Sequence, residues 1–495
     1  MAGKITDADA QEIVRLYDNQ TDPAEIAQRL NLKTAQVNAI IAHLRRSVVS
    51  DDRRTATPSE NGGHAQNDEL DESADRKQFV KEYSSDPEPE PEAPPIIARE
   101  EGRRVDRVVE EAEETHEGIF IGNDAEYGDP QYWNPQDAGA VNNPHMMIVG
   151  ESGSGKTYAT LCLTAELAHR GLPTIIFDYA QGFELDQLDD VYKKYVKVQE
   201  FRIGEDGISL NPLQIFPNDV KGPSSVATRV SDVFDAVYRL GPIQTRVLID
   251  AILATFEKVG ILPNVPSSWK ADAPNFGQLQ QTLDDLASDK AHQHSKNAVG
   301  VSARLTPFFM LSSFGSSEQR WSWESLFADP KHKVHVLQFR GLEGKTQNIT
   351  LEILLWHLFF YLKSHGKAKL RIYIVLDEAH HLSFREGGPI DMLLREARKF
   401  GLGVVFASQQ PEDFSNVAFD NTASKLIFQT NDPALKVSRF IAAKCSNYDS
   451  PESIHDAISA QAQGHALFVT KNRGHLVQIA DLRTRATLWG DVQAS

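Results

Sequence analysis

The sequence predicts an α/β protein built around a doubly wound, mostly parallel sheet. From residue 118 onward, short apolar runs alternate with helical segments, and runs such as 372–376 (Ile-Tyr-Ile-Val-Leu) show no alternation of apolar and polar residues. Strands of this kind are typical of a parallel sheet that is buried on both faces. A glycine-rich loop also joins a predicted strand at 146–149 to a predicted helix at 157–169. That order of strand, loop and helix predicts a phosphate-binding site.

The expected strands and helices follow from these runs. Strands are expected at 146–149, 174–178, 334–339, 371–376, 403–407, 425–429, 466–469 and 476–479. Helices are expected between them, notably at 348–362, 389–400 and 433–443. A mostly helical insertion is expected at about 222–330, inside an α/β domain that spans 117–490.

Length and composition allow several domains and exclude few partners. The chain has 495 residues, of which 41% are hydrophobic and 24% are charged, enough for two or three domains with packed cores. Its net charge is −18, and residues 51–120 alone hold 21 acidic and 9 basic residues. Because most of the excess charge lies in that one segment, the overall acidity does not exclude DNA as a partner of the folded parts.

Other sequence features indicate a protein of the cytoplasm that has no membrane partner. Cys162 and Cys445 lie far apart in apolar helical contexts, so we expect buried thiols rather than a metal site or a disulfide framework. The N-terminus lacks the apolar core of a secretory signal. The longest apolar run, at 353–362, is interrupted by His357 and is too short to cross a bilayer.

Residues 1–48 are expected to form a small all-α domain of the helix-turn-helix kind. Its third helix carries apolar residues at Val37, Ile40, Ile41 and Leu44, the spacing of one helical face. If the domain binds DNA, this helix lies in the major groove. The candidate DNA contacts are then its polar residues Lys33, Thr34, Gln36, Asn38, Arg45 and Arg46. The pattern is short and common, so a module that docks a protein remains the alternative.

Residues 49–116 are expected to be a disordered acidic linker. The segment is poor in aromatic residues and rich in Asp, Glu, Pro and Ser, as in 84–92 (SSDPEPEPE). Charge repulsion and proline prevent such a segment from forming a packed core. We interpret it as a solvated tether, with a DNA mimic or a partner-binding tail as the alternative.

The glycine-rich loop at 150–157 (GESGSGKT) fits the phosphate-binding pattern G-x-x-x-x-G-K-[ST]. The nucleotide-binding residues are expected to be Gly150, Glu151, Ser152, Gly153, Ser154, Gly155, Lys156 and Thr157. Backbone N–H groups at the start of the helix face an anion, and the glycines let the chain curl around it. Lys156 is placed to reach the β- and γ-phosphates of ATP, and Thr157 to hold Mg²⁺. A glycine-rich turn that matches by chance is disfavoured by the flanking strand and helix.

A second motif supplies the residues that hydrolysis needs. The apolar run at 371–376 ends in Asp377 and Glu378, so Asp377 is expected in the Mg²⁺ shell and Glu378 beside the attacking water. The next predicted strand is followed by two amides, of which Gln409 is the first choice to contact the γ-phosphate and Gln410 the second. The expected cofactors are therefore ATP and Mg²⁺.

Basic residues of 395–401 (REARKFG) are candidates for an arginine finger that reaches a neighbouring subunit. Arg398 is the first choice, Arg395 the second, and Arg304 of the insertion the third. Basic residues at the end of a helix also complement its dipole, which is the alternative role. His380 and His381 lack the spacing of a metal site, so we expect local hydrogen bonding from them.

Taken together, G-E-S-G-S-G-K-T, I-V-L-D-E-A-H, R-E-A-R-K-F-G and V-V-F-A-S-Q-Q-P resemble the HerA/FtsK superfamily of ring-forming DNA translocases, and the HerA branch more closely. The resemblance covers about 118–483. It implies a RecA-like P-loop ATPase domain in a homo-oligomer, a hexamer, that threads double-stranded DNA and has ATP sites between subunits. A narrower resemblance is to DptH-type ATPases of prokaryotic anti-phage or restriction systems.

The chain departs from the HerA pattern at its start. HerA proteins usually begin with a small β-barrel, and no strands of such a barrel are evident ahead of the P-loop domain. Because that barrel often contacts the partner nuclease, this departure puts nuclease pairing in doubt. The expected function is an ATP-dependent DNA translocase or helicase. The alternative is a non-motor ATP switch that controls a partner protein or transcription through the N-terminal helices.

Overall fold

The computed structural model describes Arg29 and residues 118–489, except 138, 140, 312–313, 316–320, 433–434 and 448–449. Apart from Arg29, the expected helix-turn-helix domain lies outside the described residues, as do its six candidate DNA contacts and the acidic linker. The described residues from 118 onward belong to one compact unit.

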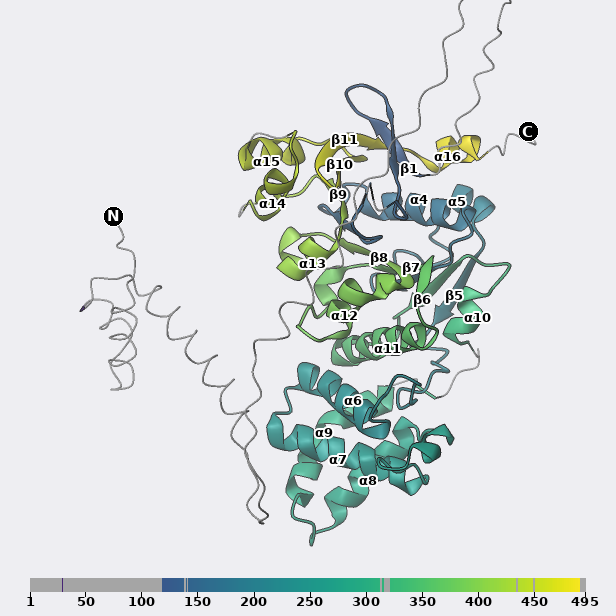
Figure 1. Ribbon diagram of the computed structural model, residues 1–495, viewed down its shortest axis with the longest axis vertical. Coiled ribbons are helices and arrows are strands. Elements are labelled where there is room, and N and C mark those ends of the chain that lie inside the picture. The colour runs from purple at the N-terminus through teal and green to yellow at the C-terminus, as the bar shows by residue number, and fades with distance from the viewer. Residues whose placement is uncertain are drawn as a thin grey trace, which may run out of the picture. The chain divides into compact units, whose positions relative to one another are not determined.

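An eleven-stranded sheet forms the centre of this unit, in the order β2-β1-β11-β10-β9-β3-β8-β7-β4-β6-β5 (Figure 1). Its strands are β1 (Ile119–Asp124), β2 (Pro130–Trp133), β3 (Met146–Val149), β4 (Thr174–Asp178), β5 (Val198–Arg202), β6 (Val334–Gln338), β7 (Ala368–Leu376), β8 (Phe400–Ser408), β9 (Ser424–Phe428), β10 (His465–Thr470) and β11 (Arg473–Ile479). The strands from β9 to β5 pair in parallel. The strands from β10 to β2 extend the sheet in antiparallel fashion.

Both faces of the sheet are buried, as the non-alternating runs predict. Along β3, Met147 and Val149 belong to one hydrophobic core, and Met146 and Ile148 belong to the core on the other face. Successive side chains of a strand point to opposite faces, so an all-apolar strand needs a cover on each side. The predicted doubly wound α/β fold is confirmed.

The covering helices follow their strands. They are α4 (Lys156–His169), α5 (Asp190–Tyr195), α11 (Gly344–Ser364), α12 (Pro389–Glu396), α13 (Asn416–Asn421), α14 (Lys436–Lys444), α15 (Pro451–Ser459) and α16 (Leu482–Leu488). Residues of α4 and α16 pack in one core, and residues of α11 and α12 pack in the other. In the described part of the chain, none of the helices has the length and apolar character needed to cross a bilayer.

The insertion is helical, as expected. It contains α6 (Pro223–Tyr238), α7 (Pro242–Lys258), the 3₁₀ helix η1 (Pro266–Lys270), α8 (Phe276–Ser288), α9 (Ser295–Leu311) and α10 (Trp323–Phe327). The helices α6 to α9 enclose a third hydrophobic core, to which α11 contributes Ile349 and Ile353. The helix α11 therefore lies between the sheet and the insertion (Figure 1).

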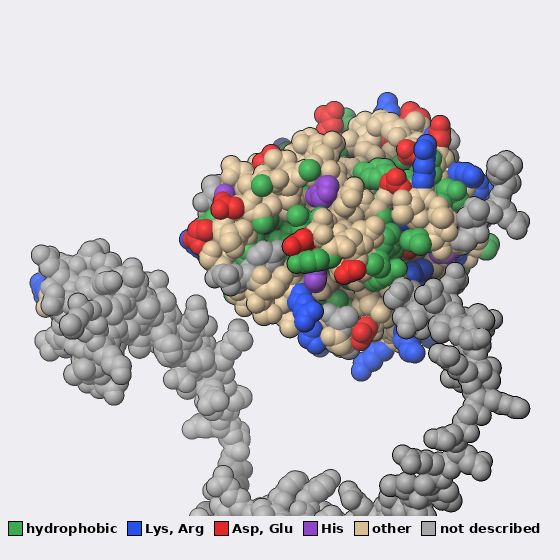
Figure 2. All heavy atoms as spheres, turned by 90° about the horizontal axis from the view of Figure 1, so that it is seen from above, with side chains coloured by type: hydrophobic (Ala, Val, Ile, Leu, Met, Phe, Trp, Pro, Cys, Tyr) green, Lys and Arg blue, Asp and Glu red, His purple; other side chains and the backbone are tan. Residues whose placement is uncertain are grey.

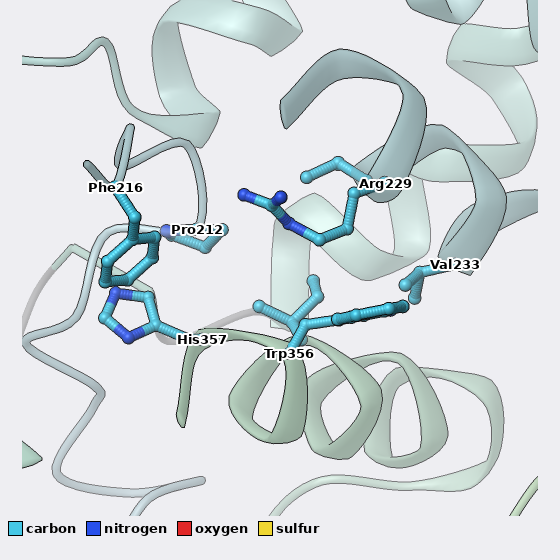
Figure 3. A pocket seen from close by; sticks show the side chains of 8 residues that line it. Pro212, Phe216, Arg229, Val233, Trp356 and His357 are labelled. Atoms are coloured by element: carbon cyan, nitrogen blue, oxygen red, sulfur yellow. The ribbon is translucent and has the colours of Figure 1, made fainter. Parts of the chain in front are cut away.

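A small cavity marks the junction between the insertion and α11. Figure 3 shows Arg229 of α6 and Trp356 and His357 of α11 around the same space. Arg229 pairs with the buried Asp219 at 2.8 Å and lies 4.0 Å from the ring centre of Phe360. The cavity measures about 10 Å³, roughly the room for one water. It is a packing junction, and a nucleotide does not fit there.

Three strands were not predicted: β2 and β5, which form the two edges of the sheet, and β1, which lies between β2 and β11. β5 (VQEFR) is polar at most positions and ends in the exposed Arg202, and β2 is four residues long and begins with Pro130. β1 and β2 lie ahead of the P-loop among the described residues; β1 pairs with β11 of the main sheet, and β2 pairs with β1. Both cysteines are free and buried, as expected, and burial raises the pKa of the Cys162 thiol to about 11.

Candidate functional site

The loop between β3 and α4 adopts a conformation that its glycines permit. A Cβ atom at Gly150 would lie 2.5 Å from Cβ of Phe428, closer than real Cβ contacts allow. Gly153 and Gly155 have φ angles of +80° and +111°, a region that side chains disfavour. Gly155 is the residue directly before α4, so the loop ends at a helix N-terminus. Such an N-terminus presents unpaired N–H groups to an anion.

Residues directly after β9 and directly before β10 form hydrogen bonds with this loop. The backbone N–H of Glu151 donates to the carbonyl of Gln429 at 2.8 Å, and Glu151 Oε1 accepts from the N–H of Asn431 at 3.0 Å. The N–H of Gly464 donates to the carbonyl of Ser154 at 3.1 Å. Residues more than 270 positions away in sequence thus fix the loop, a relation that no local motif could reveal.

Lys156 lies among groups that leave its charge only partly compensated. Its Nζ donates to the carbonyl of Glu151 at 3.0 Å. Burial lowers the pKa of Lys156, and the nearby carboxylates of Glu378, Asp377 and Glu151 act in the opposite direction. A phosphate in the loop would supply the anionic partner that a half-buried ammonium lacks.

Asp377 has the environment of a cation ligand. Burial first, and then the charges of Glu378 and Asp178, raise the pKa of Asp377 to about 7. A divalent cation beside the carboxylate would reverse this shift. Mg²⁺ is usually held by one or two carboxylates together with hydroxyl and phosphate oxygens, and Thr157 and Asp377 line the same cavity. These two residues fit the metal that the sequence predicts.

Glu378 occupies a strained position directly after Asp377. Its φ of 49° and ψ of 60° are left-handed, which costs about 1–3 kcal/mol for a residue other than glycine. Its Oε1 accepts a hydrogen bond from Nε2 of Gln409 at 3.0 Å. Gln410, the second choice among the amides, does not line the cavity around Glu378, and its backbone N–H donates to Oδ2 of Asp413 at 3.3 Å. The structure thus brings Gln409, and not Gln410, to the carboxylate.

These groups share one cavity of about 240 Å³. The expected residues that line it are Ser152, Gly153, Gly155, Lys156, Thr157, Asp377, Glu378 and Gln409. It is also lined by Tyr158, Ser408 and Gln463, which the sequence analysis missed. Ser408 ends β8, and its place beside β3 in the parallel register could have indicated it.

The three candidate arginines lie away from this cavity. Arg398 donates to the carbonyl of Asn142 at 2.6 Å, at the sheet edge where β3, β7 and β8 begin, whereas the P-loop lies where these strands end. Arg395 pairs with Asp391 at 2.5 Å, and Arg304 donates to Gln244 Oε1 at 2.7 Å within the insertion. Their proposed role therefore concerns the site of another subunit.

The chain is similar to HerA proteins in sequence. Residues 137–358 match the family model of the central domain of helicase HerA. The DNA double-strand break repair helicase HerA of Sulfurisphaera tokodaii is 21% identical over 345 residues, which cover 66% of this chain and 62% of that protein. HerA of Saccharolobus solfataricus is 20% identical over 344 residues, with the same coverage. The match spans less than two thirds of the length of these relatives.

Solved structures show the same fold. VirB4 of Thermoanaerobacter pseudethanolicus superposes with a TM-score of 0.58 at 17% identity, covering 73% of this chain and 96% of that chain. The bacterial conjugative coupling protein TrwB superposes with a TM-score of 0.50 at 13% identity, covering 74% and 89%. The predicted RecA-like P-loop ATPase fold is confirmed. Asp377, Glu378, Gln409 and Arg398 lie beyond the residues that the family model matches, so their roles rest on geometry.

Proposed function

Because the chain carries a P-loop ATPase domain of the HerA/FtsK superfamily, we propose that it couples ATP hydrolysis to movement along double-stranded DNA. One observation carries the ATPase part. Lys156 after β3, Asp377 and Glu378 after β7, and Gln409 after β8 meet in one cavity at the ends of three adjacent parallel strands.

Each residue has a distinct task in this proposal. The N–H groups of the loop and Lys156 bind the β- and γ-phosphates, with the Nζ of Lys156 exchanging the Glu151 carbonyl for a phosphate oxygen. Thr157 and Asp377 would hold Mg²⁺, which when bound neutralises phosphate charge. Glu378 orients the attacking water and accepts its proton, and Gln409 contacts the γ-phosphate.

The proposed substrate is DNA because the similar proteins are described as DNA double-strand break repair helicases. Figure 2 shows lysine and arginine side chains interspersed with acidic ones on one face of the described residues, so we assign no DNA path to that face. We propose a homo-oligomeric ring, a hexamer, because the candidate arginines lie away from their own site. Pairing with a nuclease and a role in phage defence belong to the same proposal.

ATP hydrolysis by the full chain, with and without linear duplex DNA, tests this function. We expect DNA to stimulate hydrolysis, and Lys156→Ala and Glu378→Gln each to lower kcat by a factor of about 100 or more. Glu378→Gln should still bind ATP, because the loop is intact. Hydrolysis in the wild type that is indifferent to DNA of any length would contradict the proposal and favour the non-motor switch.

A further inference from the structure

The catalytic glutamate has one satisfied and one unsatisfied oxygen. Oε1 of Glu378 accepts from Gln409, whereas Oε2 is buried and has no hydrogen-bond partner among the described residues. Nδ1 of His380 lies 3.1 Å from this Oε2. The two atoms are within hydrogen-bonding distance, and a buried carboxylate oxygen without a donor is costly. The imidazole is therefore the nearest donor for the second oxygen.

Backbone geometry places His380 at this point. Glu378 begins a 3₁₀ turn, η2 (Ala379–His381), in which the N–H of His381 donates to the carbonyl of Glu378 at 3.0 Å. The left-handed φ of Glu378 folds the chain back, so a side chain two residues later returns to the carboxylate. The strain at Glu378 and the position of His380 are thus parts of one local structure.

A column of aromatic rings braces the imidazole. The His380 and His381 ring centres are 4.0 Å apart, and His381 stacks on Tyr179 at 5.1 Å with an interplanar angle of 9°. Tyr179 stacks in turn on Phe339 at 4.6 Å, also at 9°. Tyr179 follows β4 directly and Phe339 follows β6 directly, and both are buried. The column rests on two buried rings, and the His380 side chain, which is 42% exposed, lies at its outer end beside Glu378.

We propose that His380 is a positioning residue that holds one oxygen of Glu378 while Gln409 releases the other. The inference rests on the proposed ATPase function. When Gln409 turns to the γ-phosphate, Oε1 becomes free and His380 keeps the carboxylate from rotating away. The water oxygen then bonds to the γ-phosphorus, the bond to the β-phosphate oxygen of ADP breaks, and the water proton moves to Oε1.

The column gives the two histidines contacts that need no metal. The described residues contain no group of three or more His, Cys, Asp or Glu that could hold a metal ion. A ring that is stacked face to face, as His381 is on Tyr179, is held by packing, and its neighbour His380 faces a carboxylate. The sequence analysis expected local hydrogen bonding from the two histidines, and Glu378 is the local partner that the structure gives to His380.

Steady-state hydrolysis and ATP binding by full-length variants test this inference. His380→Leu removes the donor, His380→Gln keeps one, and His365→Leu alters an exposed histidine at the end of α11 as a matched control. We expect His380→Leu to lower kcat about 10–100-fold with KM and the Kd of a fluorescent ATP analogue within about twofold of wild type. His380→Gln should recover most of kcat, and the control should match wild type.

Two results would overturn the inference. One is a kcat for His380→Leu equal to that of the control, and the other is a loss of ATP binding as large as the loss of kcat, which would indicate a structural role. Lys156→Ala, assayed beside these variants, separates the two proposals. If wild type hydrolyses ATP no faster than Lys156→Ala, the proposed function fails and this inference with it. If wild type is active and His380→Leu equally so, only the inference fails.

Discussion

At the scale of single residues, the site combines buried charged groups and a strained backbone, which are unfavourable without a ligand. Asp377 is buried beside two other carboxylates, Lys156 is half-buried, and Glu378 has a left-handed backbone. Perturbed groups of this kind cluster at functional sites, because the ligand supplies the missing partner. The position of Lys425 is different, because this residue is distant from the cavity and nothing in the proposed reaction uses it.

Lys425 should make stability depend on pH. Burial, together with the charge of Lys444, lowers its pKa to about 7. Its Nζ donates to the carbonyl of Thr422 at 2.5 Å and lies 4.5 Å from the ring centre of Phe440. Since the pKa is depressed on folding, stability is highest above the unfolded value of 10.5 and falls as pH drops toward 7.

Lys425→Met should therefore raise the free energy of unfolding at pH 6–7 by on the order of a few kcal/mol, and with it the melting temperature. The gain should shrink toward pH 10. Thermal unfolding across this pH range measures it. Lys290→Met, at an exposed lysine of the insertion, is the control and should have little effect. A gain for Lys425→Met that is the same at every pH would show that the ammonium is not the cause.

At the scale of elements, the sequence predicts the central strands of the sheet and misses β1, β2 and β5. The bounds of β3 and β4 agree with the expected 146–149 and 174–178 because all their residues are apolar or lead into a motif. β1 (IFIGND) was missed although it lies inside the sheet, because its apolar run is only three residues long. β2 and β5 were missed because edge strands carry polar side chains and take their form from pairing rather than pattern. For the same reason the supports of the P-loop at Gly464 and Asn431 could not be predicted.

The candidate site divides in the same way. The loop at 150–157 and the pair Asp377–Glu378 are contiguous motifs, so the sequence contains them whole. The contact of Gln409 with Glu378 and the column behind His380 depend on strand order, which brings β4, β6, β7 and β8 together. Sequence patterns named single candidates for the first group, whereas for the γ-phosphate contact they offered both Gln409 and Gln410 and did not indicate the ring column.

The amino-terminal edge of the sheet yields a test of the proposed arginine finger. Arg398 lies there, in the turn between α12 and β8, away from its own P-loop. If it acts on a neighbouring subunit, Arg398→Ala and Glu378→Gln should each be inactive, and a mixture of the two should hydrolyse ATP at a sizeable part of the wild-type rate. In the mixture, an intact glutamate and an intact arginine meet at some interfaces.

A mixture of Lys156→Ala with Glu378→Gln is the matched control for this complementation. Both residues belong to the same side of a site, so a subunit with Lys156→Ala can never be completed by its neighbour. If the mixture of Arg398→Ala with Glu378→Gln is as inactive as this control, Arg398 is not an arginine finger. Its role is then the contact with the carbonyl of Asn142.

At the scale of the whole molecule, the domain joins a sheet that carries the candidate nucleotide site to a helical insertion with its own core. The two share α11, which contributes residues to the cores on both of its sides. The buried pair of Arg229 and Asp219 ties α6 to this junction, so a displacement of the insertion would disturb α11. Under the proposed function, this junction would link the nucleotide site of the sheet to the insertion.

Displacement of a third strand from duplex DNA tests the central claim, movement driven by ATP, most directly. The account predicts that wild type displaces a triplex-forming oligonucleotide only with ATP, and that Glu378→Gln fails to displace it although it binds ATP. Brisk hydrolysis by wild type that leaves the third strand in place, on duplexes of any length, would contradict the account and leave an ATP-dependent switch.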